Sequence, residues 1–364
     1  MEIKNVTIAG GGVLGAQIAY AAAFHGFNVT IWGRSEGSIE RVKPRIDSIY
    51  NMYTKELAIA PTYIGSENPN YPRSFFADKS EITEARIDEL KAKNEAVYAN
   101  MKYSTDLEEA VKDADLVIEA IAEIVEEKKA FYEKMAPFLK DDAIIVTNSS
   151  TLLPSTFREY TGREDKFLSL HFANNIHRQN LAEVMRHDRT SDESFEAVVQ
   201  FAKDIGMYPA IINKEQPGYI LNSILVPLIN AGLKLYGDDI ASPEDIDMDW
   251  KIGTGSPRGP FEIIDIVGIT TVINITSANP EAKDPNSALG KAVAKLKERA
   301  DKGLKGIETG EGFYNYIIRN ILLQYYFHQS HGKMLRSSLV RTFRGCLDRR
   351  CHLHLVLEPC CRNF

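Results

Sequence analysis

The chain has 364 residues, 44% of them hydrophobic and 26% charged, which is typical of a globular protein large enough for two domains. Its formal net charge of -7 argues against nucleic acid or an anionic membrane surface as a partner. The sequence contains no apolar run long enough to cross a membrane and opens with no signal-peptide pattern, so we expect a cytoplasmic protein.

A glycine-rich turn lies between the first predicted strand and the first predicted helix. Gly10, Gly12 and Gly15 occupy the G-x-G-x-x-G positions directly after an apolar run. This pattern allows a tight turn, a close approach of pyrophosphate to the backbone, and close packing of the helix on the strand. The N-terminus of the helix then points its N–H groups at the phosphates. We therefore predict a dinucleotide site formed by Gly10, Gly12, Val13, Leu14 and Gly15.

The second predicted strand, residues 28–32, ends where such a fold contacts the adenosine ribose. NAD sites usually place Asp or Glu there, whereas Gly33, Arg34 and Ser35 follow this strand. A guanidinium and a hydroxyl suit a 2′-phosphate, so we predict NADP(H) bound through Arg34 and Ser35. NAD(H) is the alternative, with Glu36 contacting the ribose from a shifted position.

The elements that follow alternate between helix and strand. Helices are predicted at residues 39–57, 80–98 and 191–205, and strands at 101–104, 115–120, 143–148, 166–174, 181–185 and 207–212. In open α/β sheets ligands bind at the carboxyl ends of the strands, which places Glu119 and Ser150 where chemistry is expected. Beyond residue 217 the pattern becomes helical, at 219–235, 243–252 and 287–302.

These patterns predict three segments. Residues 1–213 form an N-terminal α/β domain of the doubly wound Rossmann type, and residues 214–317 a smaller all-α domain. Residues 318–364 are atypical, with eight Lys and Arg against two Asp and Glu, all four cysteines, and four of the eight histidines. No spacing there matches a zinc site, so we expect an irregular or disordered extension with no metal and no catalytic role.

Seven segments, in order, resemble the 3-hydroxyacyl-CoA dehydrogenase family. They are the glycine turn, residues 117–120, 148–152, 170–174 with Glu183, 217–222, 259–262 and 309–314. The sequence of residues 148–155 and 171–174 is most similar to the diketoreductase branch of this family. The resemblance implies a Rossmann domain followed by a helical domain that forms a homodimer.

The resemblance also implies that His171 and Glu183 form the acid/base pair. The residue types agree, because imidazole ionises near neutrality and can move a hydroxyl proton in either direction. A carboxylate on the other ring nitrogen fixes the tautomer and stabilises the imidazolium. The alternative is a core histidine, with Glu183 in a surface ion pair.

By the same resemblance, Ser150 bonds the substrate oxygen and Asn222 supports it from the second domain. Glu119, Asn174 and Ser150 are expected at the nicotinamide end of the cofactor site. The alternatives are a helix-capping or interface amide for Asn222 and ordinary strand-end hydrogen bonds for the others.

Two departures from the family pattern bear on the substrate. Ala173 and Asn175 stand where the family commonly has Phe and Pro. Arg178, in the loop that follows, either meets a carboxylate or a CoA phosphate or faces solvent. His25, His177 and His187 belong to no motif, and we expect structural roles for them.

We therefore expect an oxidoreductase that reversibly converts a 3-hydroxyacyl-CoA, or a related β-hydroxy carbonyl compound, to its 3-keto form. One alternative keeps the chemistry but takes a free hydroxy acid or a diketo ester, as in diketoreductase or gulonate dehydrogenase. Another is a non-catalytic, crystallin-like dinucleotide-binding protein, against which the intact His171–Glu183 pair argues.

Overall fold

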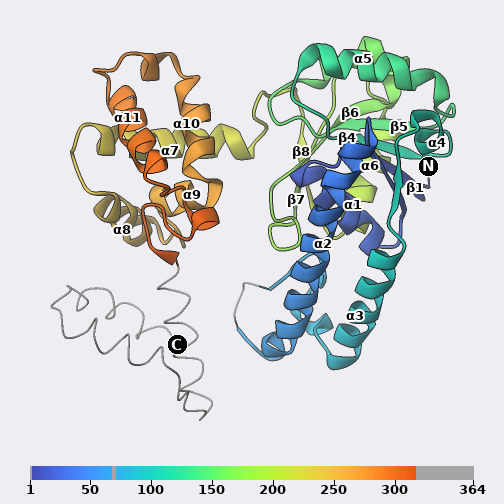
Figure 1. Cartoon of the computed structure of the whole chain (residues 1–364), viewed down its shortest axis with the longest axis horizontal. Helices are drawn as coiled ribbons and strands as arrows, with labels where there is room; N and C mark the ends of the chain where they lie inside the picture. Colours follow the sequence, from blue (N-terminus) through green and yellow to red (C-terminus); the bar gives the residue numbers. More distant parts are fainter. Residues whose placement is uncertain (1, 68–70, 317–364) are drawn as a thin grey trace. The chain divides into compact units, whose positions relative to one another are not determined.

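The computed structural model describes residues 2–67 and 71–316, which divide into two compact units. The first unit ends at Ile224 and the second begins at Leu225 (Figure 1). The predicted extension at 318–364 lies outside the described residues. Within the described residues, no single helix is long and apolar enough to cross a membrane. One bent pair, Pro260–Val267 with Ile269–Ser277, meets the criteria of length and composition together.

The first unit is built on an eight-stranded sheet in the order β3-β2-β1-β4-β5-β6-β7-β8. Strands β1 to β6 run parallel, β7 pairs antiparallel with β6, and β8 runs parallel to β7. The strands are β1 (Asn5–Ala9), β2 (Asn28–Trp32), β3 (Lys102–Ser104), β4 (Leu116–Glu119), β5 (Ile144–Thr147), β6 (Phe167–Phe172), β7 (Leu181–Met185) and β8 (Tyr208–Ile212). The predicted doubly wound α/β class is confirmed.

Helices cover both faces of this sheet, because its central strands are apolar on both sides. One core joins the sheet to α1 (Val13–Phe24), α2 (Glu36–Ile59), α3 (Glu84–Ala99) and α6 (Asp192–Asp204). A second core joins the opposite face to α4 (Leu107–Val111) and α5 (Val125–Met135). Helices α2 and α3 lie side by side as a long pair (Figure 1).

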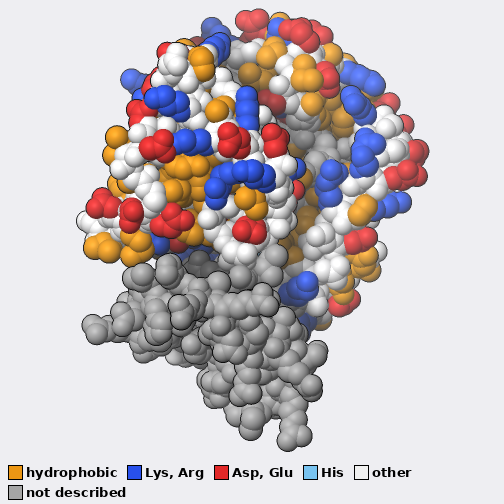
Figure 2. Space-filling view, turned by 60° about the vertical axis from the view of Figure 1, so that its left-hand side comes forward, with side chains coloured by type: hydrophobic (Ala, Val, Ile, Leu, Met, Phe, Trp, Pro, Cys, Tyr) orange, Lys and Arg blue, Asp and Glu red, His pale blue; other side chains and the backbone are white. Residues whose placement is uncertain are grey.

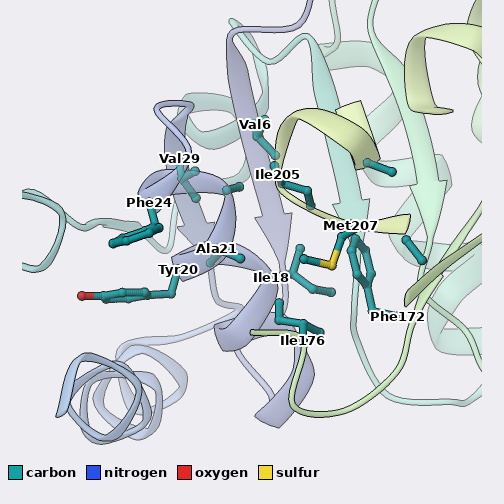
Figure 3. Close-up of a cluster of buried hydrophobic side chains, with 14 of the residues drawn as sticks. Val6, Ile18, Tyr20, Ala21, Phe24, Val29, Phe172, Ile176, Ile205 and Met207 are labelled. Atoms are coloured by element: carbon teal, nitrogen blue, oxygen red, sulfur yellow. The ribbon is translucent and has the colours of Figure 1, made fainter. Parts of the chain in front are cut away.

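The larger core packs α1 directly on the sheet. Ile18 and Ala21 of α1 are fully buried in the same cluster as Val6 of β1 and Phe172 of β6 (Figure 3). Met207, which precedes β8, belongs to it as well. The strand and helix that flank the glycine turn are therefore anchored on the centre of the sheet.

The starts of α3 and α7 come later than the sequence predicts, whereas α2 begins at Glu36 rather than at residue 39. Helix α3 begins at Glu84 rather than near residue 80, because the Thr83 side chain caps it by accepting the N–H of Arg86. Helix α7 begins at Leu221 rather than at residue 219, because Gly218 and Tyr219 have φ angles of 80° and 55°. A left-handed backbone cannot continue into a right-handed helix.

The second unit is helical, as the all-α prediction required. It contains most of α7 (Leu221–Gly237), then α8 (Pro243–Thr254), α9 (Pro260–Val267), α10 (Ile269–Ser277) and α11 (Ala288–Asp301). Their apolar faces meet in one core that includes Leu233, Phe261 and Leu296. Helices α9 and α10 were not predicted, since a single residue, Gly268 with φ of 93°, separates two short apolar helices.

Two buried aspartates tie the end of the described chain to the second unit. Asp247 accepts hydrogen bonds from the N–H groups of Phe261 and Glu262 and from the hydroxyl of Tyr314. Asp265 accepts them from the N–H groups of Phe313 and Tyr314 and from the hydroxyl of Tyr316. Burial raises the pKa of both carboxyl groups above the usual range, although these donors oppose the shift.

We predict that Asp265→Ala destabilises the protein by about 2–4 kcal/mol, because it leaves two buried N–H groups without an acceptor. Urea unfolding followed by circular dichroism measures the loss. Asp249→Ala is the control, since Asp249 is exposed on α8. Equal midpoints for the two variants would contradict the anchoring role of Asp265.

Candidate active site

The glycine turn has the geometry that its pattern predicts. Gly10 has φ of 110°, and a Cβ atom there would lie 2.5 Å from the carbonyl oxygen of Ala120. A Cβ on Gly15 would overlap the carbonyl oxygen of Gly10. By contrast, a Cβ on Gly12 would meet nothing within 4 Å, so open space lies against the backbone at the N-terminus of α1.

A cavity of about 310 Å³ adjoins this turn. It is lined by Gly12, Val13, Leu14, Gly15, Ala120, Ile121, Glu123, Lys128, Asn148, Ser150 and Thr151. Five of these residues were predicted from the sequence as site residues. An open backbone, a helix N-terminus and polar side chains suit a dinucleotide, so the residues present fit such a cofactor.

Glu119 lies behind the wall of this cavity and organises one of its polar groups. Its carboxylate is fully buried and accepts hydrogen bonds from Lys128 Nζ at 2.6 Å and from the hydroxyls of Tyr132 and Thr147, both at 2.8 Å. Lys128 is itself only 1% exposed, and its Nζ lies 3.3 Å from Glu123. Glu119 therefore orients Lys128, which lines the cavity.

Glu123 and Lys128 were missed by the sequence analysis. Burial raises the pKa of the Glu123 carboxyl, but hydrogen bonds from Ser149 and Thr151 and the charge of Lys128 outweigh it and leave the pKa below its usual range. Lys128 stands in the first half of α5, a helix that was not predicted. The sequence signal for this group was Lys128 itself, which follows soon after Glu119 and Glu123 at the end of the predicted strand.

Strands β6 and β7 bring His171 and Glu183 together. The two residues are direct partners in the antiparallel register, and Nδ1 of His171 lies 3.0 Å from Oε2 of Glu183. The other oxygen of Glu183 accepts the N–H groups of Ile220 and Leu221, each at 2.9 Å. Both oxygens of this buried carboxylate are thus satisfied by donors.

The second ring nitrogen of His171 faces Ser150. The Oγ atom of Ser150 lies 3.1 Å from Nε2. Because an ionised carboxylate only accepts hydrogen bonds, the pairing assigns the proton of the neutral imidazole to Nδ1 and leaves Nε2 as the acceptor. Ser150 also lines the cavity, so the Glu183–His171–Ser150 chain ends at the cavity wall.

The remaining predicted residues are not among those that line the cavity. Asn174 is exposed in the loop after β6, and Asn222 is half-buried on the first turn of α7. Arg178 is held by Glu56, with Nε and one terminal nitrogen each 2.7 Å from a carboxylate oxygen. Its charge is therefore paired within the protein. Each ring nitrogen of His25 contacts a backbone carbonyl oxygen at 2.8 Å, as a structural role requires.

Arg34 and Ser35 follow β2, as the sequence places them. The Arg34 side chain is 75% exposed, and its nearest carboxylate, Glu127, is 3.6 Å away. Ser35 caps α2 by accepting the N–H of Ser38. The Ser38 hydroxyl lies 3.0 Å from that of Ser35 and accepts a hydrogen bond from Arg41, so one guanidinium group and two hydroxyls meet at the start of α2.

Comparison with protein families matches both parts of the chain. Residues 5–216 match the NAD binding domain of 3-hydroxyacyl-CoA dehydrogenase, and residues 218–316 match its C-terminal domain. The chain belongs to the 3-hydroxyacyl-CoA dehydrogenase family. It is accordingly an oxidoreductase with a nicotinamide cofactor, as predicted.

Individual relatives agree with this assignment. The chain is 33% identical to human mitochondrial hydroxyacyl-coenzyme A dehydrogenase over 320 residues, which cover 86% of this chain and 91% of the relative. Among solved structures, a diketoreductase described by its catalysis of dicarbonyl compounds is 43% identical, with a TM-score of 0.73, covering 87% of this chain and all of that one. The (S)-3-hydroxybutyryl-CoA dehydrogenase of Ralstonia eutropha is 29% identical, with a TM-score of 0.64, covering 86% and 99%.

We predict that Gly12→Ala weakens nucleotide binding about tenfold or more without destabilising the fold. The added methyl group meets no protein atom within 4 Å, but it occupies the open space against the backbone. Isothermal titration with NADPH and NADH, together with thermal unfolding, measures both effects. Gly253→Ala is the matched control, because a Cβ there also meets nothing within 4 Å. Unchanged nucleotide affinity in Gly12→Ala would contradict the assignment.

Proposed function

We propose that this member of the family reversibly oxidises a 3-hydroxyacyl-CoA to the corresponding 3-ketoacyl-CoA. The observation that carries the proposal is the Glu183–His171–Ser150 chain, which ends at a cavity beside the glycine turn. A bound nicotinamide supplies the acceptor or donor of hydride. The side chains of this protein supply the proton transfer, the alignment of the substrate and the exclusion of water.

His171 is the proposed acid/base group. In oxidation its Nε2 takes the proton of the substrate hydroxyl, and in reduction the imidazolium returns it. Ser150, 3.1 Å from Nε2, donates a hydrogen bond to the same substrate oxygen and stabilises the negative charge that develops on it. Glu183 holds the Nδ1 proton and stabilises the imidazolium, while its second oxygen stays fixed by two backbone donors.

The residues proposed to hold the cofactor surround the cavity. The N-terminus of α1, from Gly12 to Gly15, faces the pyrophosphate, and Lys128 and Glu123 offer an ammonium and a carboxylate to ribose hydroxyls. Glu119 acts through Lys128, which it orients. Contacts of Asn174 with the cofactor and of Asn222 with the substrate oxygen stay predictions from the family resemblance.

We infer a preference for NADP(H), with NAD(H) as the alternative. Arg34 is exposed directly before Ser35, and Ser35 is linked to Ser38 and, through it, to Arg41; these residues would provide both charge and donors for a 2′-phosphate. The alternative requires Glu36 at the ribose. However, the Glu36 carboxylate accepts a hydrogen bond from the Thr105 hydroxyl at 3.3 Å, which favours the first assignment.

A second candidate substrate class is supported by the solved relatives. The diketoreductase, at 43% identity, is described as acting on dicarbonyl compounds. The same proton-transfer chain serves a free diketo acid or ester, because the reacting carbonyl is the same and only the group beyond it changes. The gulonate dehydrogenase type belongs to this class, whereas a non-catalytic role conflicts with the assembled His171–Glu183 pair.

The oligomeric state and the cellular location do not follow from the active site. A homodimer is supported by large apolar side chains exposed on α7, α8 and the segment between them: Leu235, Ile240, Met248, Trp250 and Ile252. Figure 2, with the left-hand side of Figure 1 turned forward, shows apolar side chains exposed among charged ones. A cytoplasmic location stays a prediction from the sequence.

We predict that His171→Ala lowers kcat by about 10² to 10⁴, because general acid/base catalysis contributes that much, while nucleotide affinity stays within about twofold. Nicotinamide absorbance during reduction of acetoacetyl-CoA and of a diketo ester, measured in parallel, tests both the residue and the substrate class. His25→Ala is the control, since the ring nitrogens of His25 contact the carbonyl oxygens of Ala21 and Ser74 and none of the residues that line the cavity.

Retained turnover in His171→Ala would overturn the acid/base assignment. Turnover of the diketo ester alone would move the substrate class to non-CoA dicarbonyl compounds. In Glu183→Gln, the neutral amide no longer stabilises the imidazolium, so kcat for oxidation is expected to fall while nucleotide affinity is retained.

We predict that Arg34→Ala raises the KM for NADPH about tenfold and leaves that for NADH within about twofold, because only NADPH carries a phosphate there. Steady-state kinetics with the two cofactors measures the change. Arg86→Ala is the control, since Arg86 is a surface arginine paired with Glu89. A proportional change with both cofactors would count against a phosphate contact.

A further inference from the structure

Tyr219 lies flat against the imidazole ring of His171. The two ring centroids are 4.4 Å apart and the planes differ by 19°. Tyr219 is only 1% exposed, so the stack is buried. Neither the glycine turn nor the Glu183–His171–Ser150 chain accounts for this residue.

The hydroxyl of Tyr219 fixes the far end of its ring to the segment that carries Ser150. It donates a hydrogen bond of 2.7 Å to the carbonyl oxygen of Ser149. Ser149 directly precedes Ser150, whose hydroxyl is 3.1 Å from Nε2 of His171. The aromatic ring is therefore held at both ends, by its own backbone and by the segment that carries Ser150.

The backbone next to Tyr219 contacts Glu183, the remaining residue of the proposed proton-transfer chain. The two residues that follow, Ile220 and Leu221, donate their N–H groups to Glu183. Three consecutive residues thus contact His171 through a ring, the Ser150 segment through a hydroxyl, and Glu183 through the backbone. The segment before α7 touches every part of the proposed proton-transfer chain.

The conformation of Tyr219 is uncommon. Its φ of 55° lies in the left-handed region, which non-glycine residues other than Asn and Asp rarely adopt. Such a backbone persists only where the surrounding contacts determine it, and it concentrates at functional sites. Here Tyr219 contacts His171 and Ser149, and the next two residues bind Glu183.

We propose that Tyr219 is a positioning residue that holds the His171 ring in the plane where both of its nitrogens stay paired. This inference rests on the proposed proton transfer. Rotation of the imidazole about its Cβ–Cγ bond would break the contacts with Glu183 and Ser150, and a flat ring stacked on it blocks that rotation. The π face also attracts the imidazolium that forms during oxidation.

The charges around the stack come from several elements. Glu183 on β7 is in direct contact with His171, while Glu119 on β4 and Glu123 after it also act on Tyr219. Lys128 on α5 pairs with both of these glutamates. Replacing Tyr219 by an uncharged side chain leaves all four groups in place, so a change in the rate reports on the ring itself.

The test compares Tyr219→Phe, which keeps the ring, with Tyr219→Leu, which removes it. We expect Tyr219→Phe to retain at least about a third of kcat and Tyr219→Leu to lose about tenfold or more, with the KM for substrate and the nucleotide affinity within about twofold in both. Tyr20→Leu is the matched control. Tyr20 is also buried, with an edge contact to Tyr53 and a hydroxyl bonded to Asn94, but it lies in the α1–α3 core.

A second measurement does not depend on turnover. The Hε1 signal of His171 can be assigned in the nuclear magnetic resonance spectrum by its loss in His171→Ala. The ring current of Tyr219 should displace the chemical shift of this signal from the usual value for histidine. We expect Tyr219→Phe to keep that displacement and Tyr219→Leu to remove it. A displacement without turnover on either substrate class would reject the proposed reaction but leave the stack intact.

Two outcomes overturn the inference. One is a kcat for Tyr219→Leu that stays within about threefold of the unmodified protein or falls no further than the kcat of Tyr20→Leu. The other is an equal loss in Tyr219→Phe and Tyr219→Leu, which would assign the effect to the hydroxyl rather than to the stacked ring.

Discussion

The register between β6 and β7 is the constraint on which the proposed chemistry depends. In an antiparallel pair each residue has one direct partner, and His171 is opposite Glu183. A slip of one position would turn Glu183 to the other face of the sheet and leave the imidazole without its carboxylate. This register places Nδ1 of His171 3.0 Å from Oε2 of Glu183. This is why residues twelve positions apart in the sequence meet.

A buried carboxylate is costly unless all its acceptor positions are used. Glu183 meets this condition with one oxygen on His171 and the other on two backbone N–H groups that precede or begin α7. Those N–H groups are free to donate because the first turn of a helix has no intrahelical acceptors. The start of α7 thus completes the hydrogen bonding of the pair that β6 and β7 form. The left-handed turn at Gly218 and Tyr219 directs the first N–H groups of α7 toward Glu183.

The sequence was sufficient where a local pattern carries the information, and it was insufficient where the site depends on elements distant in the chain. The glycine turn is a local pattern. Gly10 and Gly15 avoid clashes with Ala120 and Gly10, and Gly12 leaves the backbone open. The fold class follows from the order of the apolar strands. The His171–Glu183 pair came from family resemblance. Lys128 and Tyr219 were missed because one requires α5 to be placed against β4, and the other requires a backbone conformation that tyrosine rarely adopts.

The residue after β2 shows how packing limits cofactor recognition. A Cβ atom on Gly33 would lie 2.8 Å from Cδ1 of Ile39 and 3.1 Å from Cβ of Ser38, both of which belong to α2. An aspartate at that position, the usual ribose ligand of NAD sites, would require α2 to shift or Ile39 to change rotamer. Ile39 is buried, so such a change would disturb the packing of α2 against the end of β2. The absence of a carboxylate at this position is therefore coupled to how closely α2 approaches the strand.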